Sequence, residues 1–194
     1  MLIKPGERLV FFGDSLTLRT DLKHTEYPAL HYCLDYSESY VDILVKRLLI
    51  HAPQLEFTFY NCGNGGDTIQ HLLERYAEDV LPLHPDRMFL WIGQNDAKNW
   101  DAVRFEQGVR CLLGWCRQDN IQVVVLSTSA HRDKQKMIVL SQADDILKKL
   151  SEEFGCDYVD VKTPMLTVMN HNRVAVYPIQ LFTLGSHLSE LGNM

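Results

Sequence analysis

The sequence predicts an α/β protein in which helices cover both faces of a central, mainly parallel sheet of five strands. Five short apolar runs rich in β-branched and aromatic residues alternate with longer segments whose apolar residues recur at helical spacing. Strands that alternate with helices form parallel sheets with right-handed crossovers. No linker, internal repeat or low-complexity segment interrupts the alternation, so residues 1–194 are predicted to form a single domain.

Each predicted element follows from its local pattern. The strands are expected at residues 9–12, 55–60, 88–92, 123–126 and 158–161. The helices are expected at 41–48, after a cap at Ser37 or Ser39, at 69–80, after a cap at Asp67 or Thr68, and at 105–116 and 143–154.

Two long stretches, 17–36 and 162–185, show no regular pattern and are predicted to be loops that wall the substrate site. The second stretch is rich in apolar residues. Packing on the domain, a lid and a subunit contact are equal alternatives for it.

The bulk composition limits the partners. Hydrophobic residues make up 46% and charged residues 23% of the chain, which is typical of a soluble globular protein. The formal net charge of -6 argues against nucleic acid or an anionic membrane surface, because both favour clustered Lys and Arg. A small-molecule substrate is therefore expected, without stable membrane association, and a homo-oligomer is left open.

The cysteines and histidines give no sign of a metal or a disulfide framework. The five cysteines are odd in number and contain no Cys-x-x-Cys pair, and the histidines lack the spacing of metal ligands. The first residues contain Pro5 and Gly6 where a secretory signal would need its apolar core. The sequence predicts a cytoplasmic protein with neither metal nor cofactor.

Polar, glycine-containing turns follow three of the predicted strands. They are Gly13-Asp14-Ser15, the segment 61–68 and the segment 93–96, and His187 lies near the C-terminus outside any predicted strand. Because the carboxyl ends of parallel strands meet at one edge of a sheet, we expect the three turns to lie together. A serine, a histidine and several amide donors are the groups that an acyl-transfer site needs.

Each of these residues has a chemical task in such a site. Ser15 is the candidate nucleophile and His187 the candidate base that takes its proton. The backbone N–H groups of Ser15 and Gly66 and the side-chain amide of Asn95 are candidate donors to the oxygen of the tetrahedral intermediate.

These motifs resemble the SGNH hydrolase superfamily, also called GDSL esterases and lipases. Gly13-Asp14-Ser15-Leu16 is similar to the first family block, Asn61-x-Gly63-x-x-Gly66-Asp67-Thr68 to the second, Gly93-x-Asn95-Asp96 to the third and His187-Leu188-Ser189-x-x-Gly192 to the histidine end of the last. The resemblance implies a flavodoxin-like α/β/α sandwich of three layers. It also implies that Ser15 is the nucleophile, that Gly66 and Asn95 complete the oxyanion hole and that His187 is the base.

One position departs from the family pattern. The last block normally reads Asp-x-x-His, but Leu184 stands three residues before His187, and a leucine cannot accept a hydrogen bond from the histidine. A main-chain carbonyl near residues 182–185 or the carboxylate of Glu190 could orient His187 instead. The third alternative is a weakened or altered site.

The sequence therefore predicts a serine ester hydrolase that forms an acyl-enzyme. The block spacing, with Tyr40-Val41-x-x-Leu44 before the second block, resembles the bacterial branch of carbohydrate acetylesterases and small-ester hydrolases. One alternative is a lysophospholipase or thioesterase that places longer acyl chains along 165–182. Another is a weakly active or inactive member that binds an acylated or sugar ligand.

The neighbouring polar residues have structural interpretations. Asp14 is expected to stabilise its own turn, and Cys62 to be a small core residue. The charged residues 74–79 are expected to form a solvated helix face.

Overall fold

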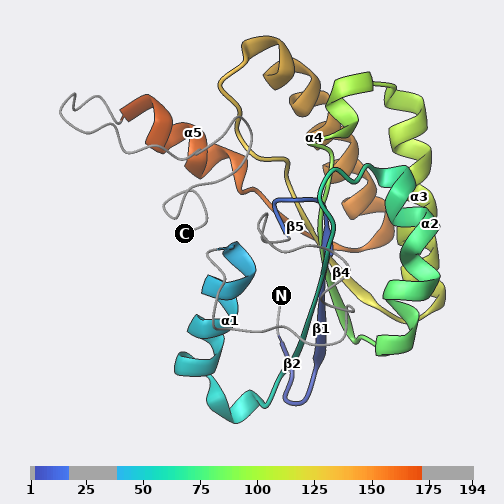
Figure 1. Cartoon of the computed structure of the whole chain (residues 1–194), viewed down its shortest axis with the longest axis vertical. Coiled ribbons are helices and arrows are strands. Elements are labelled where there is room, and N and C mark those ends of the chain that lie inside the picture. The colour runs from blue at the N-terminus through green and yellow to red at the C-terminus, as the bar shows by residue number, and fades with distance from the viewer. Residues whose placement is uncertain (1–2, 18–38, 172–194) are drawn as a thin grey trace.

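The computed structural model describes residues 3–17 and 39–171, and within them five parallel strands form one sheet. The strand order is β2-β1-β3-β4-β5 (Figure 1). The strands are β1 (Arg8–Gly13), β2 (Thr58–Gly63), β3 (Arg87–Trp91), β4 (Gln122–Leu126) and β5 (Asp157–Val159).

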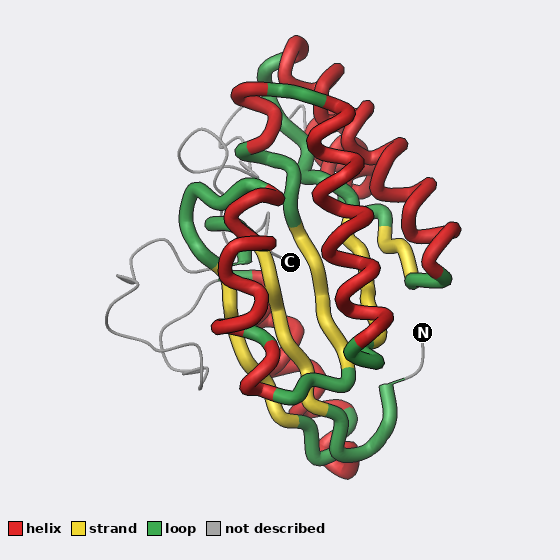
Figure 2. The backbone as a smooth tube through the Cα atoms, turned by 90° about the vertical axis from the view of Figure 1, so that its right-hand side faces the viewer, coloured by secondary structure: helices red, strands yellow, loops and turns green. Residues whose placement is uncertain are grey.

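Helices cover both faces of this sheet. They are α1 (Tyr40–His51), α2 (Ile69–Asp79), α3 (Ala102–Gln118), α4 (Lys134–Phe154) and α5 (Lys162–His171). α2, α3 and α4 lie on one face and α1 and α5 on the other, as Figures 1 and 2 show. The step from β1 to β2 runs toward one edge of the sheet, whereas the steps from β2 to β3, β4 and β5 run toward the other edge. Right-handed crossovers therefore place α1 on the face opposite to α2, α3 and α4. The predicted three-layer α/β/α sandwich is confirmed.

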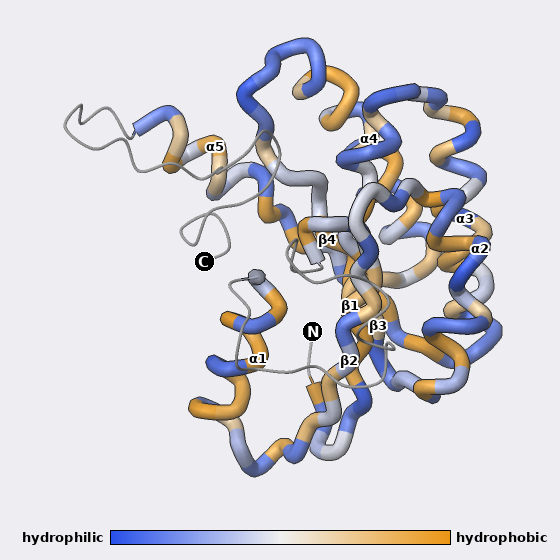
Figure 3. The backbone as a smooth tube through the Cα atoms, in the orientation of Figure 1, coloured by the Kyte–Doolittle hydropathy of each residue, from blue (hydrophilic) through white to orange (hydrophobic). Residues whose placement is uncertain are grey.

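The core lies in two layers, one on each face of the sheet. Val10 and Phe12 of β1 pack in the layer beneath α2, α3 and α4, whereas Leu9 and Phe11 pack with residues of α1 and α5. All four side chains are fully buried. A strand covered on both faces reads as a continuous apolar run, which is why the sequence identified β1. Apolar residues are accordingly concentrated around the strands in Figure 3.

Side-chain caps fix where the helices begin. Ser39 caps α1 by accepting a hydrogen bond from the Asp42 N–H. Thr68, rather than Asp67, is the N-cap of α2. α4 begins at Lys134, well before the predicted residue 143, because the carboxylate of Asp133 caps it.

Two further predicted boundaries, besides the start of α4, were wrong. The second strand runs from Thr58 to Gly63 rather than over 55–60, because Pro53–Leu55 form a 3₁₀ turn and Glu56 adopts a left-handed φ of 49°. The predicted loop at 162–185 begins with helix α5, Lys162–His171, and the remainder of that stretch lies outside the described residues. Of the other loop, 17–36, only Thr17 is described.

Candidate active site

The three polar turns meet at the carboxyl-terminal edge of the sheet, as predicted. Gly13, the last residue of β1, pairs with Gly63 of β2 on one side and with Trp91 of β3 on the other. The backbone N–H of Asn64 donates to the Gly13 carbonyl oxygen over 2.9 Å. Ser15 therefore leaves the sheet between the turns that carry Gly66 and Asn95.

The turn at Ser15 is held tightly from both ends. A Cβ atom at position 13 would collide with the carbonyl oxygen of Trp91, so only glycine fits there. The Asp14 carboxylate accepts from the Leu16 N–H over 2.9 Å, and the Asp14 carbonyl accepts from the Thr17 N–H over 3.0 Å. Asp14 is 1% exposed, whereas Ser15 is partly exposed. The turn thus buries its carboxylate and presents its serine at the surface of the site.

The second turn needs a glycine at position 66 for a different reason. Gly66 has a φ of +87°, and a Cβ atom there would meet nothing within 4 Å. The backbone conformation therefore favours glycine, because L-residues rarely adopt such a φ. Gly66 is exposed and lies just before Asp67, two residues from the helix cap at Thr68. Its N–H lies close to the positive end of the α2 dipole.

Asn95 connects all three turns. Its Nδ2 donates to the Asp67 carbonyl oxygen over 3.1 Å and to Asp14 Oδ2 over 3.4 Å. The next residue, Asp96, accepts from the Ile69 N–H at the start of α2 over 3.0 Å. The structure therefore links Asn95 to Asp14 and Asp67, the residues directly beside the predicted oxyanion residues Ser15 and Gly66.

Sequence reasoning missed Arg75, which it assigned to a solvated helix face. Arg75 is only 15% exposed and pairs with Asp67 over 2.7 Å and with Asp79 over 2.6 Å. It also donates to the Gly13 carbonyl over 3.1 Å, and its guanidinium lies 4.4 Å from the centroid of the Phe12 ring. One feature of the sequence could have identified Arg75 as a site residue. Asp67 lies on the preceding turn, and a carboxylate that is buried at the edge of the sheet needs a positively charged partner. Arg75 ties α2 to the two turns that carry Ser15 and Gly66.

Two carboxyl groups in this region, buried Asp14 and partly buried Asp96, have displaced pKa values. Burial is the main cause that raises the pKa of Asp14 to about 7, and the negative charges of Asp96 and Asp67 add to it. Burial likewise raises the pKa of Asp96 to about 6, against the hydrogen bond from the Ile69 N–H. Shifted carboxyl groups of this kind are frequent at functional sites.

Cys62 lies in the core, as predicted. It is 3% exposed, and burial raises its pKa to about 12, so the thiol is inert at neutral pH.

The predicted base, His187, lies outside the described residues, as do Leu184 and Glu190. The geometry between Ser15 and His187 therefore stays a prediction, as do the three alternatives for the group that orients the histidine.

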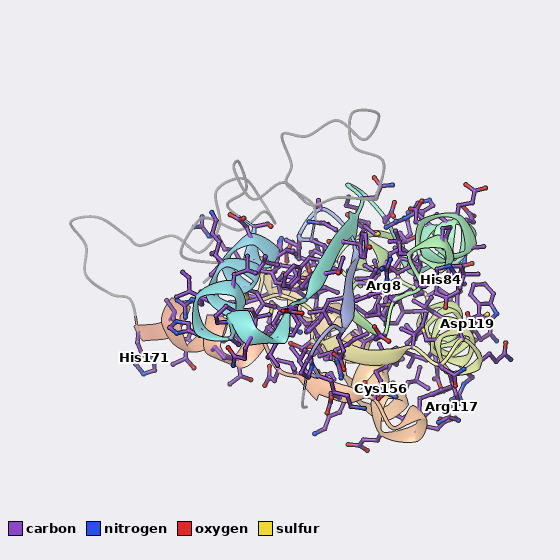
Figure 4. The ribbon with its side chains drawn as sticks, turned by 90° about the horizontal axis from the view of Figure 1, so that it is seen from below. Arg8, His84, Arg117, Asp119, Cys156 and His171 are labelled. Atoms are coloured by element: carbon purple, nitrogen blue, oxygen red, sulfur yellow. The ribbon has the colours of Figure 1, made fainter. Side chains whose placement is uncertain are left out.

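Other histidine and cysteine side chains are scattered. His171 lies at the outer end of α5, on the other side of the molecule from His84 and Cys156 (Figure 4). Within residues 3–17 and 39–171, no group of three or more His, Cys, Asp or Glu side chains is placed to hold a metal ion. In the same ranges no helix combines the length and apolar character needed to cross a membrane.

Comparison with known proteins gives one consistent family. An acetylxylan esterase from Geobacillus stearothermophilus is 25% identical over 209 residues, covering 100% of this chain and 92% of that protein. The crystal structure of Axe2, an acetylxylan esterase from the same organism, matches with a TM-score of 0.83 at 24% identity and covers 100% of this chain and 91% of its own. A catalytic mutant of Axe2, in which an aspartate is replaced by alanine, matches with a TM-score of 0.85 at 24% identity and the same coverage.

The sequence model of the GDSL-like Lipase/Acylhydrolase family matches residues 11–193, a range that includes all four blocks identified above. The fold agrees with this match, because the five-stranded parallel sheet brings the first three blocks to one edge. The chain therefore belongs to the GDSL-like lipase/acylhydrolase, or SGNH, family of carboxylic ester hydrolases.

Proposed function

We propose that this acylhydrolase cleaves short-acyl esters, with acetyl esters as the preferred class, through an acyl-enzyme. Ser15 Oγ attacks the ester carbonyl carbon while His187 takes its proton. The tetrahedral intermediate then expels the alcohol, which receives that proton from His187. Water, deprotonated by His187, attacks the acyl-enzyme in the same way and returns Ser15 to its free form.

The network around Asn95 is the observation that carries this proposal. Its amide contacts Asp14, next to the nucleophile, and the carbonyl of Asp67, next to Gly66. The turns that carry Ser15, Gly66 and Asn95 are thereby tied together, which supports the proposal that donors from all three serve the oxygen on which the intermediate develops its charge. Removing one such donor typically lowers kcat by about 10² to 10³-fold.

The lining of a neighbouring cavity favours a polar substrate over a long acyl chain. A cavity of about 150 Å³ lies beside Asn95, between the N-terminal ends of α2 and α3. Its wall includes the polar side chains of Gln70, Asn99, Asp101 and Arg104. An alkyl chain placed there would strip water from these groups without offering them hydrogen bonds, which costs free energy. The similarity to acetylxylan esterases supports the same preference.

The structure weakens one argument for a lysophospholipase or thioesterase that takes longer acyl chains. It depended on the apolar residues of the predicted loop at 165–182. Met165 is instead 8% exposed in the core beneath α5, and Leu166 and Met169 pack against the same core. The first part of that apolar run is therefore used for folding.

Leu184 is the reason to test whether this chain is a weakly active member of the family. Axe2 has an aspartate whose replacement defines a catalytic mutant, whereas this chain has leucine three residues before His187. Disabling the equivalent carboxylate in serine proteases lowers kcat by about 10⁴-fold, yet the other groups still catalyse. A slow but measurable esterase is the expected result.

Hydrolysis of p-nitrophenyl acetate by the wild-type chain, Ser15→Ala and His187→Ala tests the enzyme activity. Both variants should lose at least about 10²-fold in kcat, and equal rates for all three proteins would refute the proposal. A series of p-nitrophenyl esters from acetate to decanoate then tests acyl length. Best kcat/KM at two to four carbons is expected, and an optimum at eight or more would favour the long-acyl alternative.

A further inference from the structure

Asp14 is a buried carboxyl group to which the mechanism above gives no task. It is 1% exposed, and its two oxygens face different partners. Oδ1 accepts from the Leu16 N–H of its own turn over 2.9 Å, and Oδ2 accepts from Nδ2 of Asn95 over 3.4 Å. One oxygen therefore serves the local turn, and the other reaches the side chain of a different strand connection.

The second contact selects one end of the Asn95 amide. A side-chain amide carries a donor nitrogen and an acceptor oxygen, and a rotation about its last bond exchanges them. Asp14 Oδ2 and the Asp67 carbonyl are both acceptors, so together they hold the nitrogen inward and fix the plane of the amide. The nitrogen carries two N–H groups: the Asp67 carbonyl takes one over 3.1 Å, and the long 3.4 Å contact with Asp14 leaves the second able to be shared with an oxyanion. The amide oxygen, turned the same way, would repel the oxyanion.

We propose that Asp14 is a positioning residue whose ionised carboxylate fixes the donor end of the Asn95 amide toward the ester carbonyl oxygen, an inference that rests on the proposed function. Asparagine at position 14 would still accept from the Leu16 N–H. It would place an NH₂ group where Oδ2 stands, so that two donors would face each other and the Asn95 amide would shift or turn over.

The charges around Asp14 make its ionisation depend on pH near neutrality. Asp67 from the second turn and Asp96 from the third raise its pKa, while Lys136 of α4 lowers it, and burial is the largest cause of the rise to about 7. The charge of Asp14 in turn acts on the buried phenol of Tyr40 in α1, whose pKa it helps to raise after the larger effect of burial. Because Oδ1 is occupied by the Leu16 N–H, the proton bound below that pKa goes to Oδ2, where it opposes the Asn95 amide.

A double-mutant cycle tests whether Asp14 acts through Asn95. The kcat for p-nitrophenyl acetate is measured for wild type, Asp14→Asn, Asn95→Ala and the double variant, with thermal unfolding recorded for each. Asp14→Asn should lower kcat by about 10²-fold in the wild-type background with little change in KM, and by less than about twofold in the Asn95→Ala background. Equal factors in the two backgrounds, or an unchanged kcat, would overturn the inference.

Glu7→Gln is the matched control, since Glu7 is a second buried carboxylate that directly precedes β1, at the end of the strand opposite to Asp14, and pairs with Arg87 over 3.0 Å. It should change kcat by the same small factor in both backgrounds. A coupling to Asn95 as large as that of Asp14 would show a general structural effect and overturn the inference.

The pH dependence of the wild type gives a test that needs no folded Asp14 variant. Below about pH 7 the ionisation of Asp14 should add to that of the proposed base and make log kcat rise more steeply than one proton allows, and the slope should return to one in Asn95→Ala. A slope of one in both proteins would overturn the inference. Wild-type activity that Ser15→Ala retains in full would instead refute the proposed function itself.

Discussion

Replacing Asp14 by asparagine should stabilise the folded protein at alkaline pH while it impairs catalysis. The pKa of Asp14 is raised from 3.8 to about 7, mainly by burial, so its ionised form is disfavoured in the folded state. Below about pH 4 the group is largely protonated in both the folded and the unfolded chain, so its burial does not lower the free energy of unfolding. As pH rises from about 4 to 7 only the unfolded chain ionises freely, so the free energy of unfolding falls.

The size of this effect follows from the shift. Each pKa unit corresponds to about 1.4 kcal/mol, so the carboxylate costs at most about 4 kcal/mol above pH 7. Asparagine does not ionise and escapes this cost. Its unfavourable contact with the Asn95 amide adds a penalty of about 1–3 kcal/mol that does not depend on pH. The difference in stability between variant and wild type should therefore move by about 3–4 kcal/mol in favour of the variant between pH 4 and pH 8.

Urea unfolding of both proteins at a series of pH values between 4 and 8 measures this difference, with the midpoint and slope fitted at each pH. Glu7→Gln serves as the control of opposite sign, because it removes the negative charge that faces the buried guanidinium of Arg87 and should lower the free energy of unfolding by about 3 kcal/mol at pH 8. A stability difference between Asp14→Asn and wild type that stays constant from pH 4 to pH 8 would refute the reasoning.

Three further substitutions follow from the site. Arg75→Ala removes the guanidinium that pairs with the buried carboxylate of Asp67, so it should lower the free energy of unfolding by about 3 kcal/mol in chemical denaturation and also lower kcat. Arg75→Lys should restore the positive charge but only part of the activity. Gly13→Ala drives a Cβ atom into the backbone of β3 and should destabilise the protein by at least about 2 kcal/mol, and an unchanged melting temperature would contradict the packing described. Leu184→Asp supplies the carboxylate three residues before His187 and should raise kcat by more than about tenfold, with Leu184→Asn as the control. An unchanged kcat would favour a main-chain carbonyl or Glu190 as the partner of the histidine.

The sequence was sufficient for the architecture because each central strand is buried on both faces. Such a strand must be apolar throughout, so β1 and β3 stood out as continuous runs between helical stripes. The boundaries of β2 and α5 were less visible. Pro53 and a left-handed Glu56 delay the start of β2, and the apolar residues of α5 had no polar alternation to mark them as helical.

The candidate residues Ser15, Gly66 and Asn95 were determined by the sequence alone, because each follows a strand in a turn whose chemistry is local. Their mutual arrangement was decided only by the tertiary structure. The contact between Asp14 and Asn95 joins positions 81 residues apart, and the pairing of Arg75 with the Gly13 carbonyl joins positions 62 residues apart. A charged residue on a helix is usually solvated, and only the burial of Asp67 at the sheet edge makes Arg75 part of the site. Local patterns therefore name the candidate groups for the chemistry, whereas the burial that fixes the charge and orientation of their neighbours exists only once the sheet has formed.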